Sequence, residues 1–206
     1  MCFATLCIAH GPIQQQDTTK SGYEFVPNVG QWHPAIRYKA AIPYGNLFLE
    51  SDALHYLLTN PRDYDRVSQW KHDNPTKHTD ESLGMHSVRM RFLGMEYAPK
   101  LKAENTLERY YNYYVGNNPA NWASKVHPSV QVNYQEIYPG VNLEILGQQG
   151  LKYQWRISNP TKKKIASIQI AVEGANRIAL KNGQVIIETT CGSITDDRLF
   201  VYQQID

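Results

Sequence analysis

Hydrophobic and polar residues alternate with a period of two over much of the chain after residue 20, and this pattern most limits what the chain can fold into. The segment GLKYQWRIS is the clearest case. Every second residue from Leu151 to Ile157 is apolar, whereas Lys152, Gln154 and Arg156 between them are polar. A strand of this kind buries one face and leaves the other in water. We therefore expect Leu151, Tyr153, Trp155 and Ile157 to be buried and the three polar residues to be exposed.

Further segments read as strands separated by turns. They are NLFLESDALHYLL, HSVRMRFLG, VHPSVQVNY, KIASIQIAV, RIAL, QVIIET and RLFVYQQI. The dipeptide Asn182-Gly183 is a strong signal for a two-residue hairpin, and no segment carries a convincing helical stripe. Many short strands with regular turns predict an all-β protein, an antiparallel β-sandwich, with a smaller N-terminal β subdomain as a variant. We assign residues 20–206 to a single β-rich domain.

Residues 60–85 interrupt the pattern, and we predict a long polar loop there. Imidazole and carboxylate groups gather in and beside this loop, and both are zinc ligand types. Their spacing matches no known site, so we predict surface polarity, no metal site and no cofactor. The residues are His72, Asp73, His78, Asp80 and His86.

Charge excludes two classes of partner. The formal net charge of the 206 residues is +2, which is too small and too scattered to indicate nucleic acid or an anionic membrane. The one basic run, residues 162–164, follows a proline, and we interpret it as a solvated turn.

The apolar N-terminus, MCFATLCIAHGPIQQQ, resembles a secretory signal peptide. It is too short to span a bilayer, and no Lys or Arg occurs before Lys20. We predict a signal peptide over residues 1–13 whose true start is missing, and hence a secreted or cell-surface protein. Cys2 and Cys7 would leave with this segment, so Cys191 would remain alone and no disulfide is expected.

Catalytic motifs are lacking. The sequence has no nucleophile elbow and no phosphate loop. Paired carboxylates could make a glycoside hydrolase-like enzyme, and four acids near strand ends are candidates: Glu136, Glu144, Asp196 and Asp197. Nothing in the sequence pairs them, so we predict a protein that is not an enzyme and has no catalytic residues, with the hydrolase as a second alternative.

The segment YYNYYVGNNPANW, residues 110–122, is the densest aromatic stretch. Such a stretch is either packed core or a stacking surface for a ligand. We favour packing, with Trp122 folded back as a lid over the turn that precedes it. The alternative is a carbohydrate-binding module with an aromatic platform. The candidate ligand-binding residues are Tyr114, Asn117, Asn118 and Trp122.

Several segments, taken in order, resemble a known family. FVPNVGQW, GNLFLESDALHYLL, HSVRMRFLG, NYYVGNNPANW, YPGVNL and the closing VYQQID are similar to the motifs of an N-terminal domain of unknown function. That domain is found in Bacteroidetes-type surface proteins, ahead of SBBP β-propeller repeats or in chains that end in gliding-motility or type IX sorting domains. The resemblance covers roughly residues 22 to 206.

The resemblance implies a secreted, non-catalytic module followed by further domains, which serves assembly, spacing or adhesion. Its partners would be other domains of the same chain and a surface glycan or protein, with no nucleic acid and no membrane span. Three residues depart from the family pattern. Ala53 replaces a usual Gly, so its turn must avoid a positive φ, and Asn118 and Asn142 replace usual Asp residues.

Overall fold

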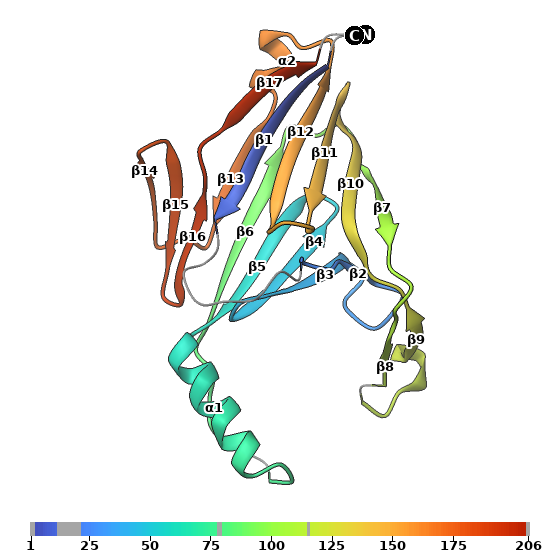
Figure 1. Ribbon diagram of the computed structural model, residues 1–206, viewed down its shortest axis with the longest axis vertical. Coiled ribbons are helices and arrows are strands. Elements are labelled where there is room, and N and C mark those ends of the chain that lie inside the picture. The colour runs from blue at the N-terminus through green and yellow to red at the C-terminus, as the bar shows by residue number, and fades with distance from the viewer. Residues whose placement is uncertain (1–2, 12–21, 78–79, 115, 205–206) are drawn as a thin grey trace.

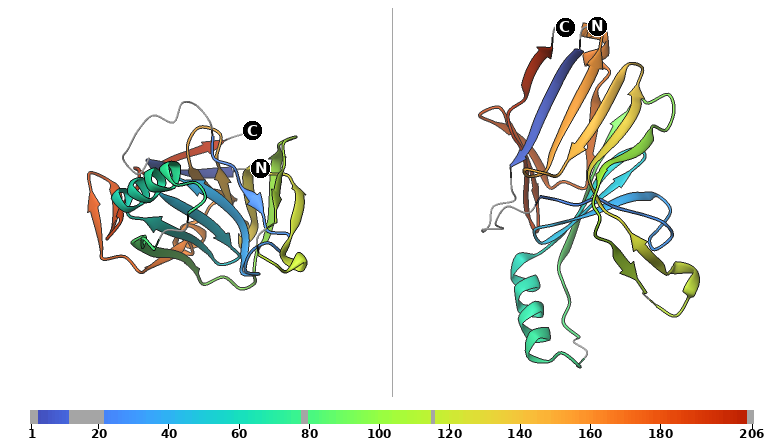
Figure 2. Two further views of the ribbon diagram at one scale, coloured as in Figure 1. Left: turned by 90° about the horizontal axis from the view of Figure 1, so that it is seen from below. Right: turned by 45° about the vertical axis from the view of Figure 1, so that its right-hand side comes forward.

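The computed structural model describes residues 3–11, 22–77, 80–114 and 116–204, without the side chains of residues 3–11 and 203–204. Two antiparallel sheets lie face to face (Figures 1 and 2), which confirms the all-β prediction. The larger sheet has the order β14-β15-β16-β1-β12-β11-β10-β7, with β17 also paired to β1. Its strands are β1 (Phe3–Gly11), β7 (Lys100–Thr106), β10 (Ser129–Tyr138), β11 (Val141–Leu146), β12 (Lys152–Ser158), β14 (Arg177–Lys181), β15 (Gln184–Thr189), β16 (Gly192–Asp196) and β17 (Phe200–Gln204).

The smaller sheet has the order β13-β6-β5-β4-β3-β2. Because the early strands pair directly with β6, and β6 pairs with β13, they are one half of the sandwich. The strands are β2 (Val26–Pro27), β3 (Ile36–Ile42), β4 (Gly45–Glu50), β5 (Ala53–Thr59), β6 (Met85–Leu93) and β13 (Gln169–Glu173).

One hydrophobic core fills the space between the sheets. Side chains of β4, β5 and β6 meet side chains of β10, β11 and β12 there. Leu151, Tyr153, Trp155 and Ile157 are all buried in or against this core, as the alternation predicts. The opposite face differs in two respects. Arg156 is exposed as predicted, but Lys152 is half-buried and Gln154 is buried, where its amide donates a hydrogen bond to the carboxylate of Glu144 on the neighbouring strand.

Residues 3–11, for which the sequence predicts part of a signal peptide, form β1. This strand pairs with β12 on one edge and with β16 and β17 on the other. It therefore occupies an interior position in the larger sheet. The signal peptide remains a prediction, and residues 12–13 lie outside the described residues.

Helix α1 (Pro61–Asp73) corrects the prediction of a polar loop over residues 60–85. Asn60 caps it, since its side-chain oxygen accepts from the backbone N–H of Arg62 (3.0 Å) and Asp63 (3.4 Å), and Pro61 takes the first helical position. Both are helix-start signals that the sequence contains. The helix carries a short apolar row of Tyr64, Val67 and Trp70, but it projects from the body and Val67 is its only buried residue.

A second short helix, α2 (Lys162–Ala166), contains the basic run that we expected to be a turn. Thr161 caps it, with its hydroxyl accepting from the backbone N–H of Lys164 (3.2 Å). The Lys164 ammonium donates to the carbonyl of Ser158 (2.6 Å), so this lysine fixes the end of β12. Neither helix of the described residues is long and apolar enough to cross a membrane.

A small two-stranded sheet lies outside the sandwich. It pairs β8 (Tyr111–Tyr113) with β9 (Ala123–Val126), and the 3-10 helix η1 (Pro119–Asn121) connects them. We call residues 108–127 the arm. At its base the N–H of Leu107 donates to the carbonyl of Pro128 (2.8 Å). The arm and α1 project from the same end of the sandwich, and β1 begins and β17 ends at the opposite end (Figure 1).

Candidate functional site

The motif FVPNVGQW builds a compact loop at the base of the arm. The side chain of Asn28 makes five hydrogen bonds to the loop backbone: it donates to the carbonyls of Trp32 (3.2 Å), His33 (3.0 Å) and Ile36 (2.8 Å), and accepts from the N–H groups of Gly30 (3.0 Å) and Trp32 (3.2 Å). Gly30 adopts a φ of 121°, which favours glycine. The motif therefore has a structural role: it fixes the backbone position of Trp32.

Trp32 joins the arm to the sandwich. Its ring meets the ring of Tyr113 edge to face at 5.3 Å, and the Lys39 ammonium lies 5.4 Å from the indole centroid. Both rings pack against a small core of Val26, Ala123 and Val126. Outside this core, the Tyr111 hydroxyl donates to Glu24 (2.8 Å), and Arg109 forms an ion pair with the same carboxylate. The arm thus has its own packed base, independent of the main core.

The outer part of the arm carries exposed aromatic rings. Tyr114 is 61% exposed and Trp122 is 45% exposed, and their rings meet at 5.8 Å with an angle of 80° between planes. The indole N–H of Trp122 donates to the carbonyl of Gly116 (3.1 Å). The expectation that Trp122 folds back as a buried lid was therefore wrong. Its N–H reaches the turn, but the ring stays on the outside.

The other candidate residues lie in the same turn. Asn118 caps η1, since its side-chain oxygen accepts from the N–H of Ala120 (3.1 Å), and Asn117 is exposed beside it. Tyr110 and Tyr111 add two more exposed rings. The structure thus places Tyr114, Asn117, Asn118 and Trp122 together on the outer arm, and their ligand-binding role remains a prediction.

The departures from the family pattern are compatible with local geometry. Asn142 accepts a hydrogen bond from the N–H of Glu136 (2.7 Å), as Asn118 does from Ala120. In both cases the side-chain oxygen is the acceptor, and an aspartate supplies the same atom. Ala53 is buried in β5 and is not among the residues with positive φ, so its turn avoids the strain that a glycine would relieve.

The four acids considered for a glycosidase each make local contacts. Glu136 accepts from the N–H of Gly140 (2.8 Å), Glu144 binds Arg156 (2.5 Å), and Asp197 accepts from the amide of Gln184 (2.7 Å). Asp196 is buried and accepts from the hydroxyl of Tyr153 (2.5 Å).

Sheet geometry separates the two buried acids. Glu144 lies on β11 and Asp196 on β16, with β12 and β1 between them. Three strand spacings of about 4.8 Å place these strands roughly 14 Å apart. Glycosidase carboxylates lie about 5 to 9.5 Å apart, so this pair cannot form such a site.

Burial of the Tyr153 phenol, and then the nearby Asp196 carboxylate, raise the pKa of Tyr153 well above its usual value.

The structure also brings together a serine, a histidine and a glutamate that the sequence analysis did not connect. The Ser87 hydroxyl lies 2.8 Å from Nε2 of His55, and Nδ1 of His55 lies 3.1 Å from the Glu50 carboxylate. Glu50 is buried and also binds Nε of Arg89 (2.9 Å). Ser87 and His55 are 32 residues apart, and only the pairing of β5 with β6 makes them neighbours.

The hydrogen bonds from Ser87 to His55 to Glu50 follow the order of a catalytic triad, but the backbone around Ser87 does not provide an oxyanion hole. Acyl transfer needs donors aimed at the developing oxyanion, most often backbone N–H groups. Ser87 stands on the outer face of β6, and in a sheet the backbone N–H groups lie in the plane of the sheet while side chains stand across it. A carbonyl placed on Ser87 would therefore meet no backbone donor of β5 or β6.

The residues considered for zinc are dispersed. His72 and Asp73 lie exposed at the end of α1, and His86 lies on β6, where it contacts Thr190 (2.9 Å) and the carbonyl of Gly174 (2.7 Å). His78 lies outside the described residues. Within the described part of the chain, no group of three or more His, Cys, Asp or Glu side chains is arranged to hold a metal ion. Cys191 is a buried free cysteine.

Together these features define an antiparallel β-sandwich domain whose sequence motifs build turns, caps and a projecting arm. The chain belongs to the DUF7948 family, a domain of unknown function, and the family match spans residues 25–206. Strand β1 precedes the matched range. Comparison with curated proteins and with solved structures gave no match.

Proposed function

We propose that this domain is a non-catalytic module of a secreted or cell-surface protein, and that its arm makes the contacts through which it serves adhesion or assembly. One observation carries this proposal: the arm exposes Tyr110, Tyr111, Tyr114 and Trp122 while a separate small core holds its base. Large aromatic side chains dominate contact energetics wherever they are buried at an interface. Aromatic rings gathered on a projection are typical of a surface that a partner covers.

The position of the arm supports the same proposal. It extends from the end of the sandwich opposite the beginning of β1 and the end of β17 (Figure 1). Neighbouring domains of the same chain would join at that opposite end, so the arm would remain accessible. We further propose the context of the family resemblance, a Bacteroidetes-type surface protein with SBBP repeats or a gliding-motility or type IX sorting domain.

A second candidate function is carbohydrate binding at Tyr114 and Trp122. Exposed ring faces stack on sugars, and the exposed side-chain amides of Asn117 and Asn118 can bond hydroxyls. The two rings meet edge to face, so the ring faces turned away from this contact would be the ones that stack on a sugar. A few stacking contacts of about 1 kcal/mol each give micromolar to millimolar affinity at a shallow, wet site.

The glycoside hydrolase-like alternative receives less support, because the four acids make the local contacts described above. It would require hydrolysis that falls when Glu136, Glu144, Asp196 or Asp197 is changed. We expect no hydrolysis of a panel of nitrophenyl glycosides by the purified protein. Turnover that disappears in any one of these variants would overturn the non-catalytic assignment.

The test of the arm compares two alanine substitutions of exposed aromatic residues, one on the arm and one outside it. Binding of the purified protein to whole source cells and to a glycan array is measured for the parent, for Trp122→Ala and for Tyr97→Ala. Tyr97 is 81% exposed and lies outside the arm, between β6 and β7. We expect Trp122→Ala to lose binding and Tyr97→Ala to keep it.

The outcomes separate the two candidates. Loss on cells together with loss on the array supports carbohydrate binding, and loss on cells alone supports a protein partner. Equal binding by the parent and Trp122→Ala, with both folded by circular dichroism, would contradict a role for the arm.

Export has a separate test, because the predicted signal peptide includes residues of β1. N-terminal sequencing of the protein isolated from source cells identifies the first residue, and cell fractionation gives its location. A chain found in the cytosol with residues 3–11 retained would contradict export.

A further inference from the structure

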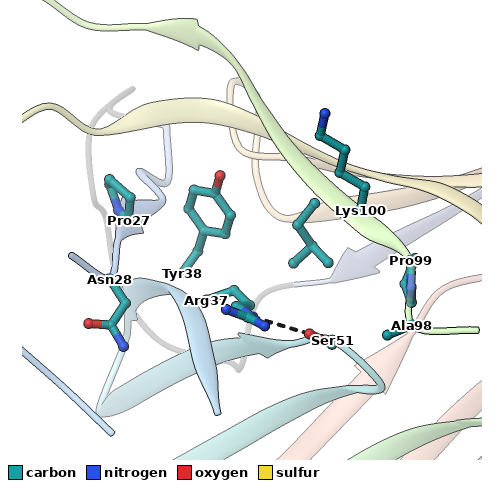
Figure 3. A pocket seen from close by; sticks show the side chains of 9 residues that line it. Pro27, Asn28, Arg37, Tyr38, Ser51, Ala98, Pro99 and Lys100 are labelled. Atoms are coloured by element: carbon teal, nitrogen blue, oxygen red, sulfur yellow. Dashed lines mark hydrogen bonds between the residues drawn. The ribbon is translucent and has the colours of Figure 1, made fainter. Parts of the chain in front are cut away.

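A cleft opens at one edge of the sandwich, where the smaller sheet meets the larger (Figure 3). It has a volume of about 430 Å³ and lies between the beginning of β3 and the beginning of β7. The residues around it come from four segments: Pro27, Asn28, Arg37, Tyr38, Ser51, Ala98, Pro99, Lys100 and Leu101. No acidic residue is among them.

A β-bulge creates the cationic side of this cleft. Consecutive residues of a regular strand point to opposite faces, yet Arg37 and Tyr38 both line the cleft. The pairing of β3 with β4 shifts register between Ile36 and Tyr38, and such a shift re-aims side chains. The irregularity therefore allows two consecutive residues, one with a guanidinium and one with a phenol ring, to line the same cleft.

The Arg37 guanidinium has a hydrogen-bond partner, but that partner carries no charge. Its Nε donates to the hydroxyl of Ser51 (3.2 Å), a neutral partner in the turn between β4 and β5. Within the described residues Arg37 has no carboxylate within 4 Å, and the same is true of Lys100 across the cleft. Six other arginines do form such pairs: Arg66, Arg89, Arg91, Arg109, Arg156 and Arg177.

The remaining lining combines a phenol ring, prolines and other apolar side chains with the polar residues Asn28 and Ser51. Tyr38 is half-buried, and burial raises the pKa of its phenol, so the ring remains neutral. Pro27, Pro99 and Leu101 complete the apolar lining. Asn28 uses its amide on the loop backbone, which makes that wall rigid but leaves it few donors for a ligand.

We propose that this cleft binds an acidic sugar residue of an anionic polysaccharide. Arg37 would bind the carboxylate, and the sugar ring would pack on Tyr38 and the prolines, while the Lys100 ammonium, which points away from Arg37 (Figure 3), would add a weaker electrostatic attraction. Arginine presents paired donors that match a carboxylate, and the volume accommodates a ring of that size. The site uses none of the arm residues, so it is independent of the function proposed for the arm.

The experiment measures binding of an oligogalacturonate to the full chain by calorimetry. A neutral oligosaccharide of equal length and inorganic phosphate serve as comparison ligands. Variants Arg37→Gln and Lys100→Gln each remove one charge from the cleft, and Lys181→Gln removes one charge from β14, which lies at the edge of the larger sheet opposite β7. Thermal unfolding of each variant establishes that it is folded.

We expect Arg37→Gln to weaken oligogalacturonate binding about 10-fold or more, as loss of a charge-assisted hydrogen bond predicts. Lys100→Gln should weaken it less, Lys181→Gln should leave it unchanged, and added salt should weaken it. Trp122→Ala should have no effect. The proposal is overturned if oligogalacturonate does not bind, if Lys181→Gln weakens binding as much as Arg37→Gln, or if phosphate or the neutral sugar binds equally well.

Discussion

Replacement of Trp155 by alanine tests whether the two sheets share one core. Trp155 is 1% exposed and lies between Phe92 (5.9 Å, edge to face) and Tyr138 (6.2 Å, stacked). A buried aromatic side chain removes roughly 150–250 Å² from water. At about 25 cal/mol per Å² this corresponds to about 4–6 kcal/mol. The retained Cβ lowers the figure and the cavity raises it, so we expect a loss of about 3–5 kcal/mol.

The same substitution on the arm is the matched control. Trp122→Ala removes a ring that is half in water and one hydrogen bond to Gly116, so it should cost less than about 1.5 kcal/mol. Guanidinium chloride unfolding followed by circular dichroism gives the free energy of unfolding of both variants. Because a loss of 5 kcal/mol can unfold a marginal domain, Trp155→Phe provides a milder version of the same test.

If Trp155→Ala lowered the free energy of unfolding by less than about 1 kcal/mol, that result would refute the shared core, because removing a ring from the centre of a shared core costs several times more. A larger loss for Trp122→Ala than for Trp155→Ala would refute it equally. Either result would mean that the two sheets do not pack as described.

Three further predictions concern other parts of the domain. Burial raises the pKa of Tyr56, Tyr134 and Tyr153 well above 10, so the native state holds protons that the unfolded chain releases above about pH 10. The stability present below that pH should therefore fall as pH rises further, and tyrosinate absorbance from these three residues should appear only on unfolding; early ionisation of all tyrosines would contradict their burial. Asn28→Ala should lower the free energy of unfolding by about 1–3 kcal/mol, because several carbonyls of its loop lose their donor, and an unchanged denaturation midpoint would show that the loop does not need it. Nitrophenyl acetate hydrolysis should not exceed that of a Ser87→Ala variant, and turnover lost in that variant would show that the array beside His55 is catalytic.

The local pattern was sufficient for about half of the strands. Alternation along residues 151–157 predicts both the strand and its buried face, because side-chain period alone determines which residues share a side. Helix α1 was not predicted by the same reasoning, since a helix that projects into water needs only a short apolar row, here Tyr64, Val67 and Trp70, within a mostly polar segment. Its capping residues, Asn60 and Pro61, were the available signal.

The sites depend on contacts that no local pattern contains. Ser87 and His55 become neighbours only through strand pairing, and Arg37 and Lys100 only through the meeting of two sheets. The exposure of Trp122 is likewise a property of its surroundings: the segment 110–122 reads equally well as core or as surface until it is known that the arm lies outside the sandwich. The sequence by itself determined about half of the strands and the buried face of β12, because these follow from neighbouring residues. Only the tertiary structure decided which polar and aromatic groups meet and which stay in water, because that depends on segments brought together across the chain.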